Sequence, residues 1–250
     1  MIMKKKKLFT RRDAIITGLT TVGGLLVTGC ASRPTPPSYG NLLRMGDNLT
    51  YIAHRLLLPG QALVKEYDVR DISSFPATGT TNPADTSKPY YSESYERFQK
   101  NAFADWRLSL EGSVSRPGTY ALADIQKLPS RTHITRHTCE EGWTAIAQWT
   151  GVPLGTILQS AGILPGARFV NFYTYDGWID SIDLLDAFHP QTMLAYGMNG
   201  RDLAIAHGAP LRLRVETQIG YKSMKYLQRI VVTDKYVDTG DSGWAWYTGI

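Results

Sequence analysis

Two imidazoles and a thiol recur at alternate positions near the middle of the chain, in Thr132-His133-Ile134-Thr135-Arg136-His137-Thr138-Cys139. If this segment is a strand, His133, His137 and Cys139 lie on one face of it. Such a set can bind a metal, although structural zinc needs four ligands from paired clusters. A second interpretation is a nucleophile pair, in which His137 lowers the pKa of the Cys139 thiol. Either histidine can instead pack and hydrogen-bond.

The first thirty residues have the order of an export signal. Basic residues precede Thr10-Arg11-Arg12-Asp13, and a short apolar run from Ala14 to Val27 follows. The run is too short, and too diluted by glycine and threonine, to span a bilayer core of about 30 Å. The paired arginines are typical of a twin-arginine signal, and the alternative is an ordinary secretory signal.

The chain has two cysteines, Cys30 and Cys139. The segment Val27-Thr28-Gly29-Cys30 resembles a lipoprotein cleavage box and predicts that Cys30 becomes the acylated first residue; otherwise Cys30 is removed with the signal. In both cases Cys139 has no partner for an internal disulfide. A lone thiol in an exported protein is expected to be deeply buried, as a small hydrophobe, or bound to something.

The formal charge of +5 comes from 27 basic and 22 acidic residues, and six of the basic residues but one acidic residue lie within positions 1–30. The remaining chain therefore carries 21 of each and no net charge. This distribution gives no reason to expect nucleic acid as a partner. With 43% apolar residues the chain can bury a substantial core.

The sequence divides into four predicted parts: a signal over 1–29, a Pro/Ser tether over 30–40, an N-terminal helix and extended arm over 41–102, and a catalytic domain over 103–250. In the last part, short strand patterns outnumber helical ones, which predicts an α+β domain with mixed β-sheets and short helices. The predicted strands span 106–112, 132–138, 168–174, 193–196, 211–215 and 226–233, and the predicted helices 121–128 and 154–161.

The residues after the cysteine, Cys139-Glu140-Glu141-Gly142-Trp143 and then Trp149-Thr150-Gly151-Val152-Pro153-Leu154, resemble the sulfite-oxidase-type molybdopterin-binding oxidoreductases, most closely their bacterial, haem-free members. The resemblance implies that Cys139, in an Arg-x-x-Cys segment headed by Arg136, supplies the one protein thiolate to molybdenum. A soft thiolate suits a redox-active metal. It also implies the sulfite-oxidase-type molybdopterin-binding fold.

Three downstream segments, 195–200, 207–212 and 220–226, resemble the second signature of that family. An arginine fork, a lysine and the amides of a glycine-led turn suit a phosphate dianion. The alternative is that Arg212, Arg214, Lys222 and Lys225 are solvated strand charges. The resemblance implies that the pterin and its phosphate are held by His207, Arg212, Ser223, Met224 and Lys225, with Thr174 at the spacing of a further contact.

The expected substrate-side residues resemble those of sulfite oxidases at one position and differ from them at another segment. Tyr247, in the C-terminal Trp-Tyr-Thr-Gly-Ile, resembles a substrate-side tyrosine of sulfite oxidases, and the alternative is an aromatic plug. Sulfite oxidases also carry an Arg-Asn-His segment early in the domain, whereas residues 75–82 contain neither arginine nor histidine. Sulfite is therefore in doubt as the substrate, although Arg70 or Arg136 can substitute.

Together these features predict a periplasmic, lipid-tethered enzyme carrying Mo-molybdopterin. The resemblance implies oxygen-atom transfer to or from a small oxyanion or an S- or N-oxide, with molybdenum cycling between Mo(VI) and Mo(IV). No Cys-x-x-Cys-His haem motif is present, so we expect a membrane cytochrome b or a soluble cytochrome c as the redox partner. The alternatives are a thiol-dependent envelope hydrolase using Cys139 and His137, and a non-catalytic envelope lipoprotein.

Overall fold

The computed structural model describes residues 62–237, together with Leu49, Ala53, Leu56 and Leu57. The predicted signal, tether, acylated Cys30 and substrate-side Tyr247 lie outside the described residues. So does the predicted helix near 41–58, except at those four positions, which are helical. Within the described part of the chain, no helix is long and apolar enough to cross a membrane.

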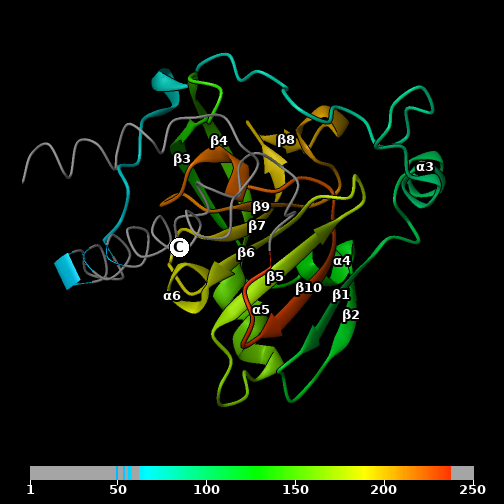
Figure 1. Cartoon of the computed structure of the whole chain (residues 1–250). Helices are drawn as coiled ribbons and strands as arrows, with labels where there is room; N and C mark the ends of the chain where they lie inside the picture. Colours follow the sequence, from blue (N-terminus) through cyan, green and yellow to red (C-terminus); the bar gives the residue numbers. More distant parts are fainter. Residues whose placement is uncertain (1–48, 50–52, 54–55, 58–61, 238–250) are drawn as a thin grey trace, which may run out of the picture. The chain divides into compact units, whose positions relative to one another are not determined.

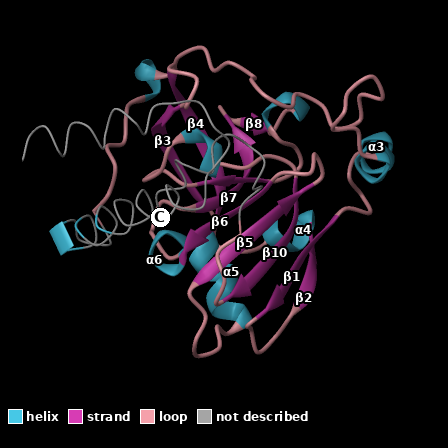
Figure 2. Ribbon diagram, in the orientation of Figure 1, coloured by secondary structure: helices cyan, strands magenta, loops and turns pink. Residues whose placement is uncertain are grey.

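In residues 62–237, ten strands form two sheets (Figures 1 and 2). The first sheet has the order β2-β1-β10-β5-β6, in which β1 and β10 are parallel and the other neighbours antiparallel. The second has the order β3-β4-β7-β8, and β9 also pairs with β7. The strands are β1 Arg107–Gly112, β2 Gly118–Ala121, β3 Arg131–Thr138, β4 Thr144–Pro153, β5 Phe169–Thr174, β6 Ile179–Asp183, β7 Met193–Met198, β8 Arg201–Asp202, β9 Arg212–Arg214 and β10 Leu227–Thr233.

The described helices are short. They are α3 Glu93–Lys100, α4 Leu122–Gln126, α5 Leu154–Ala161 and α6 Leu184–Ala187, with the 3-10 turns η1 Val69–Asp71, η2 Ile205–His207 and η3 Gly220–Lys222. Helix α5 has the predicted bounds and ends at Gly162, whose φ of 72° is accessible to glycine at little cost. Mixed sheets with few short helices confirm the predicted α+β class.

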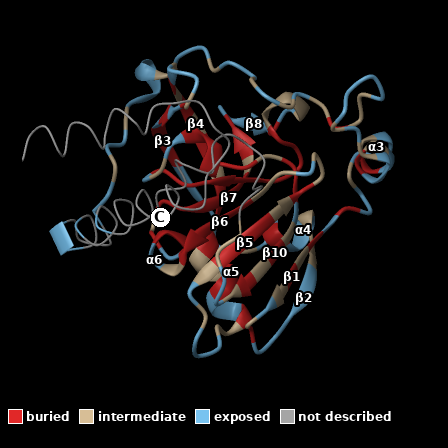
Figure 3. Ribbon diagram, viewed as in Figure 1, coloured by how far each residue is buried: buried red, intermediate tan, exposed pale blue. Residues whose placement is uncertain are grey.

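Two apolar clusters form the core (Figure 3). The larger joins the inner face of the first sheet to α5 through residues such as Trp106, Leu110 and Phe172. The smaller surrounds Trp149 of β4, and Phe75 from the N-terminal arm packs against it. The second sheet and the arm are therefore packed together beside Trp149.

The arm is fastened along the second sheet before it reaches this cluster. The Tyr67 N–H donates to the carbonyl of Ile134 in β3 at 2.9 Å, and the Ser73 N–H donates to the carbonyl of Ile146 in β4 at 3.0 Å. The Ile146 N–H in turn donates to the Ser73 hydroxyl at 2.9 Å. These bonds place the residues that follow, from Phe75 onward, over one end of β3.

Six of the described strands and helices do not appear among the elements predicted from the sequence: β2, β4, β6, β8, α3 and α6. Helix α3 lies within the segment 41–102 interpreted as N-terminal helix and arm. Glycine and proline inside β4 obscure its alternating pattern of buried positions. Helix α3 is short and buries only Tyr95 and Phe98 on one side. Two apolar positions are too few to give a clear helical period in the sequence.

Gly151 provides a test of this strand arrangement. A Cβ at Gly151 would lie 2.2 Å from the Leu194 carbonyl oxygen of β7, where β4 and β7 shift register. We expect Gly151→Ala to lower the free energy of unfolding of the cofactor-free chain by about 3 kcal/mol, because the backbone itself must move. Gly118→Ala in β2, where a Cβ meets nothing within 4 Å, should change it by less than about 0.5 kcal/mol. Equal urea midpoints for the two variants would contradict the β4–β7 register.

Candidate active site

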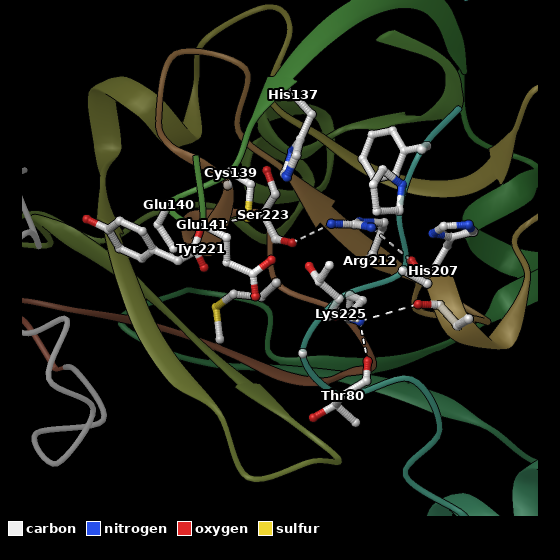
Figure 4. A pocket seen from close by; sticks show the side chains of 18 of the residues that line it. Thr80, His137, Cys139, Glu140, Glu141, His207, Arg212, Tyr221, Ser223 and Lys225 are labelled. Carbon is white, nitrogen blue, oxygen red and sulfur yellow. Dashed lines mark hydrogen bonds between the residues drawn. The ribbon is translucent and has the colours of Figure 1, made fainter. Parts of the chain in front are cut away.

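A cavity of about 390 Å³ lies where the arm, the end of β3 and the segment from η2 to β10 meet (Figure 4). Its lining comes from segments that are far apart in the sequence. The arm contributes Phe75 to Thr80, and the end of β3 with the turn after it contributes His137, Cys139, Glu140, Glu141 and Trp143. The second half of the domain contributes Asp176, Trp178, His207, Arg212, Tyr221, Ser223, Met224 and Lys225.

Cys139 follows the last residue of β3 and is a free, buried cysteine. Its N–H donates to the carbonyl of Trp143 at 2.9 Å, which closes a turn through Gly142. Burial is the largest of the effects that raise the pKa of the Cys139 thiol to about 11. The Glu140 carboxylate also raises this pKa, whereas a hydrogen bond from the Glu141 backbone lowers it. The thiol is therefore protonated at neutral pH unless a bound metal ion displaces the proton.

Arg212 in β9 is buried with one hydrogen-bonding group unused. Its Nη1 donates to the His207 carbonyl at 3.0 Å and its Nη2 donates to the Ser223 carbonyl at 2.7 Å. Its Nε has no partner among the described residues. Burial, and after it the neighbouring Arg214 charge, lower the pKa of this guanidinium. A buried cation with a free donor and a cationic neighbour is stabilised by an anion.

Lys225 adds a second cation to the same end of the cavity. Its Nζ donates to the carbonyls of Thr78 at 2.9 Å and Ala206 at 3.3 Å, and also to that of Thr80. Burial, followed by the Arg212 charge, lowers its pKa to about 8. Gly208 makes room for it, because a Cβ at Gly208 would lie 2.9 Å from the Lys225 Cβ.

The two cavity histidines are neutral. Burial, and then the Arg214 charge, lower the pKa of His137 to about 2, while burial and then Arg212 lower that of His207. The Nδ1 of His137 lies 2.6 Å from Nη1 of Arg214; since a guanidinium only donates, Nδ1 accepts and the ring proton is on Nε2. The ring of Phe75 lies between the histidines, with centroids 5.1 and 5.6 Å away.

His133 does not reach the cavity, although it shares the buried face of β3 with His137 as predicted. Its Nε2 lies 3.4 Å from Oε1 of Glu216, inside the core. Among the residues that the structure places, no group of three or more His, Cys, Asp or Glu side chains could hold a metal ion. The interpretation of this strand as a multi-ligand metal site is therefore not supported, although His137 and Cys139 both line the cavity.

The alternative that the strand cations are solvated is wrong for Arg212, Arg214 and Lys222, which are buried. Arg214 forms a double ion pair with Glu216, Nε to Oε1 at 3.1 Å and Nη2 to Oε2 at 2.8 Å. Lys222 pairs with Asp180 at 2.7 Å. Alternation along a strand shows which face a cation occupies but gives no sign of a buried partner from another segment.

Three predicted site residues do not line the cavity. Arg136 is exposed on the opposite face of β3 from His137, with its guanidinium carbon 5.4 Å from the centre of the Tyr67 ring. Arg70 is exposed and pairs with Asp68. Thr174 is buried at the end of β5, and its hydroxyl donates to Asp176 and to the Trp178 carbonyl.

Sequence reasoning missed the arm contribution, Phe75 to Thr80, and the acidic residues of the lining. Glu140 and Glu141 follow Cys139 directly, so their proximity was available from the sequence. The arm residues gave no such signal, because they reach the cavity through pairing with β3 and β4.

The donor set fits a molybdopterin group. A single free thiol lies in the same cavity as the buried Arg212, which has an unpartnered N–H, and the partly buried Lys225. Cys139 suits a soft metal, while Arg212, Lys225 and the turn after Gly220 suit a phosphate. Gly220 keeps this turn close to β3, because a Cβ there would lie 2.6 Å from Nε2 of His137.

Comparison with known proteins agrees with this chemistry. Residues 95–240 match the oxidoreductase molybdopterin binding domain family. The chain is 33% identical over 241 residues to a putative protein-methionine-sulfoxide reductase subunit, YedZ1, of Azospira oryzae, covering 95% of this chain and 87% of that one. It is 27% identical to the protein-methionine-sulfoxide reductase catalytic subunit MsrP of Xanthomonas axonopodis pv. citri, covering 94% and 73%.

Among solved structures, the sulfane dehydrogenase SoxCD from Paracoccus pantotrophus aligns with a TM-score of 0.51 and 25% identity. The alignment covers 53% of this chain and 39% of that one. These findings confirm the predicted fold, enzyme class and molybdopterin cofactor. A family match over more than half of the chain, together with a relative of 33% identity over nearly its full length, shows that this protein belongs to the sulfite-oxidase-type oxidoreductases with a molybdopterin-binding domain.

Proposed function

We propose that this protein is the catalytic subunit of an exported molybdenum enzyme that removes the oxygen atom from an S-oxide. The observation that carries the proposal is the cavity itself, in which a lone protonated thiol, the buried Arg212 and the partly buried Lys225 line one space of about 390 Å³. The names of the relatives supply the reaction class, since two of them are described as protein-methionine-sulfoxide reductase subunits.

Each cavity residue has a proposed role. Cys139 ligates molybdenum, and Arg212 and Lys225 bind the pterin phosphate together with Ser223, Met224 and His207. When bound, the group supplies two-electron oxygen-atom transfer. The arm from Phe75 to Thr80 lines the cavity, and its Thr78 and Thr80 carbonyls accept hydrogen bonds from Lys225 and so orient it.

The reaction requires two electrons and two protons from outside the substrate. A sulfoxide that accepts both becomes a thioether, and its oxygen leaves as water. The chain has no Cys-x-x-Cys-His haem motif, so the electrons come from a separate carrier, for which we propose a membrane cytochrome b or a soluble cytochrome c.

The proposed location follows from the N-terminal sequence. The paired arginines and the Val-Thr-Gly-Cys segment support export, acylation of Cys30 and attachment to the periplasmic side of a membrane. The Pro/Ser tether over 30–40, the arm over 41–102 and the catalytic domain over 103–250 complete the proposed organisation.

The thiol-hydrolase alternative has little support in the geometry. A nucleophilic pair needs an imidazole that accepts the thiol proton, but Nδ1 of His137 is already taken by Arg214. The pKa of His137 is lowered and that of Cys139 is raised, which is opposite to the thiolate–imidazolium pair that this chemistry uses.

Replacement of the proposed ligand tests the function. In protein purified from molybdate-replete cells, we expect near-stoichiometric molybdenum and a pterin that fluoresces after oxidation. Cys139→Ser should lower sulfoxide reduction by more than about a hundred-fold, because loss of even an outer contact to a metal ligand costs about 10- to 100-fold. The circular dichroism spectrum should not change. A wild-type protein with neither molybdenum nor pterin, or a serine variant with full turnover, would refute the assignment.

Lys225→Met tests the phosphate site. Loss of a charged hydrogen bond should reduce the fraction of pterin retained after gel filtration by about ten-fold or more. The matched control is Lys127→Met, at a lysine whose side chain is 77% exposed outside the cavity. Equal pterin content in the two variants would remove Lys225 from the binding site.

The pH dependence of alkylation tests the state of the thiol. With a pKa of about 11, about one Cys139 in 10,000 is a thiolate at pH 7 in the cofactor-free chain. Its rate of reaction with iodoacetamide should rise about ten-fold per pH unit up to pH 10. A rate that levels off below pH 8, measured by mass spectrometry of the Cys139 peptide, would instead favour the thiol-enzyme alternative.

A further inference from the structure

The two ends of the cavity carry opposite charge. Arg212 and Lys225 lie at one end, and the carboxylates of Glu140 and Glu141 flank Cys139 at the other (Figure 4). In the proposed function the cations face the cofactor phosphate, which leaves the carboxylates beside the reacting atoms. The acidic end is therefore the one that a substrate meets.

Both carboxylates are held near the sulfur. The Sγ of Cys139 lies 3.5 Å from Oε2 of Glu140. The indole N–H of Trp143 donates to Oε2 of Glu141 at 2.9 Å. In the part of the chain that the structure describes, these two carboxylates are the charged side chains that act on the thiol, and both raise its pKa.

Among the described residues, no cation forms an ion pair with either carboxylate. The arm segment that lines the cavity, Phe75 to Thr80, is uncharged throughout. Arg70 and Arg136 are exposed outside the cavity. Asp176 is the remaining acidic residue in the lining, and its charge acts on Lys225, as does the more distant charge of Glu141.

We propose that Glu140 and Glu141 determine the charge of the accepted substrate, by admitting a neutral oxide to the Cys139 end and repelling an oxyanion such as sulfite. The inference rests on the proposed function, which places the reacting atoms beside Cys139. At separations of about 6 Å and an effective dielectric constant between about 40 and 80, each carboxylate lowers the local concentration of a monovalent anion about three- to ten-fold.

The charge beside the sulfur can be measured without the cofactor. Iodoacetamide and iodoacetate alkylate the same thiolate, but iodoacetate is an anion. The rate constant for iodoacetamide divided by that for iodoacetate therefore does not depend on the thiolate fraction. We expect a ratio at Cys139 well above that for a free cysteine peptide in the full-length, cofactor-free chain. Glu140→Gln and Glu141→Gln should each lower it about three-fold or more, and the double variant further.

Glu93→Gln is the matched control, because Glu93 is an exposed glutamate at the start of α3 that does not line the cavity. Its ratio should equal that of the wild type. A ratio that is unchanged in the double variant would overturn the proposal, and so would an equal fall in the control. Because 1 M salt screens exposed charges, the wild-type ratio should also decrease there.

The loaded enzyme gives the second measurement. The inhibition constant for sulfite, divided by the KM for a neutral sulfoxide, should fall at least three-fold in the double variant. An unchanged quotient in a molybdenum-containing, sulfoxide-reducing enzyme would reject the charge filter and keep the proposed function. A wild type without molybdenum or sulfoxide turnover would reject the proposed function, while the alkylation ratio would still report the charge at Cys139.

Discussion

The buried ion pair between Arg214 and Glu216 is the interaction on which the site depends. Both side chains are almost fully inaccessible, and the guanidinium meets the carboxylate through two donors. Its third contact, to His137, joins β9 to β3, and its carbon lies 4.4 Å from the centre of the Trp149 ring in β4. Loss of one partner from such a pair costs about 3–5 kcal/mol, because the other charge stays buried.

The same pair sets the charge of the cofactor end. Arg212 and Arg214 are two residues apart in β9, and the Trp149 ring lies within 5.1 Å of the first and 4.4 Å of the second. Glu216 neutralises Arg214, whereas Arg212 donates only to carbonyls and has no carboxylate partner among the described residues. One positive charge is thus left in a buried place without a carboxylate from the described part of the chain, and an anionic ligand can neutralise it.

How far the sequence predicts this arrangement depends on the range of the interactions. Alternation along 132–139 correctly predicted that His133 and His137 share a buried face, because that pattern is local to one strand; Cys139 is buried in the turn that follows. It did not show that His133 would turn to Glu216, a residue 83 positions away. The contact of Lys225 with Thr78 spans 147 positions. Such contacts follow from the order of strands in the sheets, which no local pattern encodes.

The two ends of the cavity also differ in how they are built. The cofactor end is made by β9, whose backbone pairs with β7, and by the segment before β10, where Lys225 is held by the arm carbonyls of Thr78 and Thr80. The Cys139 end is made by a turn, 139–143, outside the sheet ladders. A turn can change charge without disturbing the core, whereas β9 cannot. Substrate preference can therefore change at Glu140 and Glu141 while the grip on the cofactor stays the same.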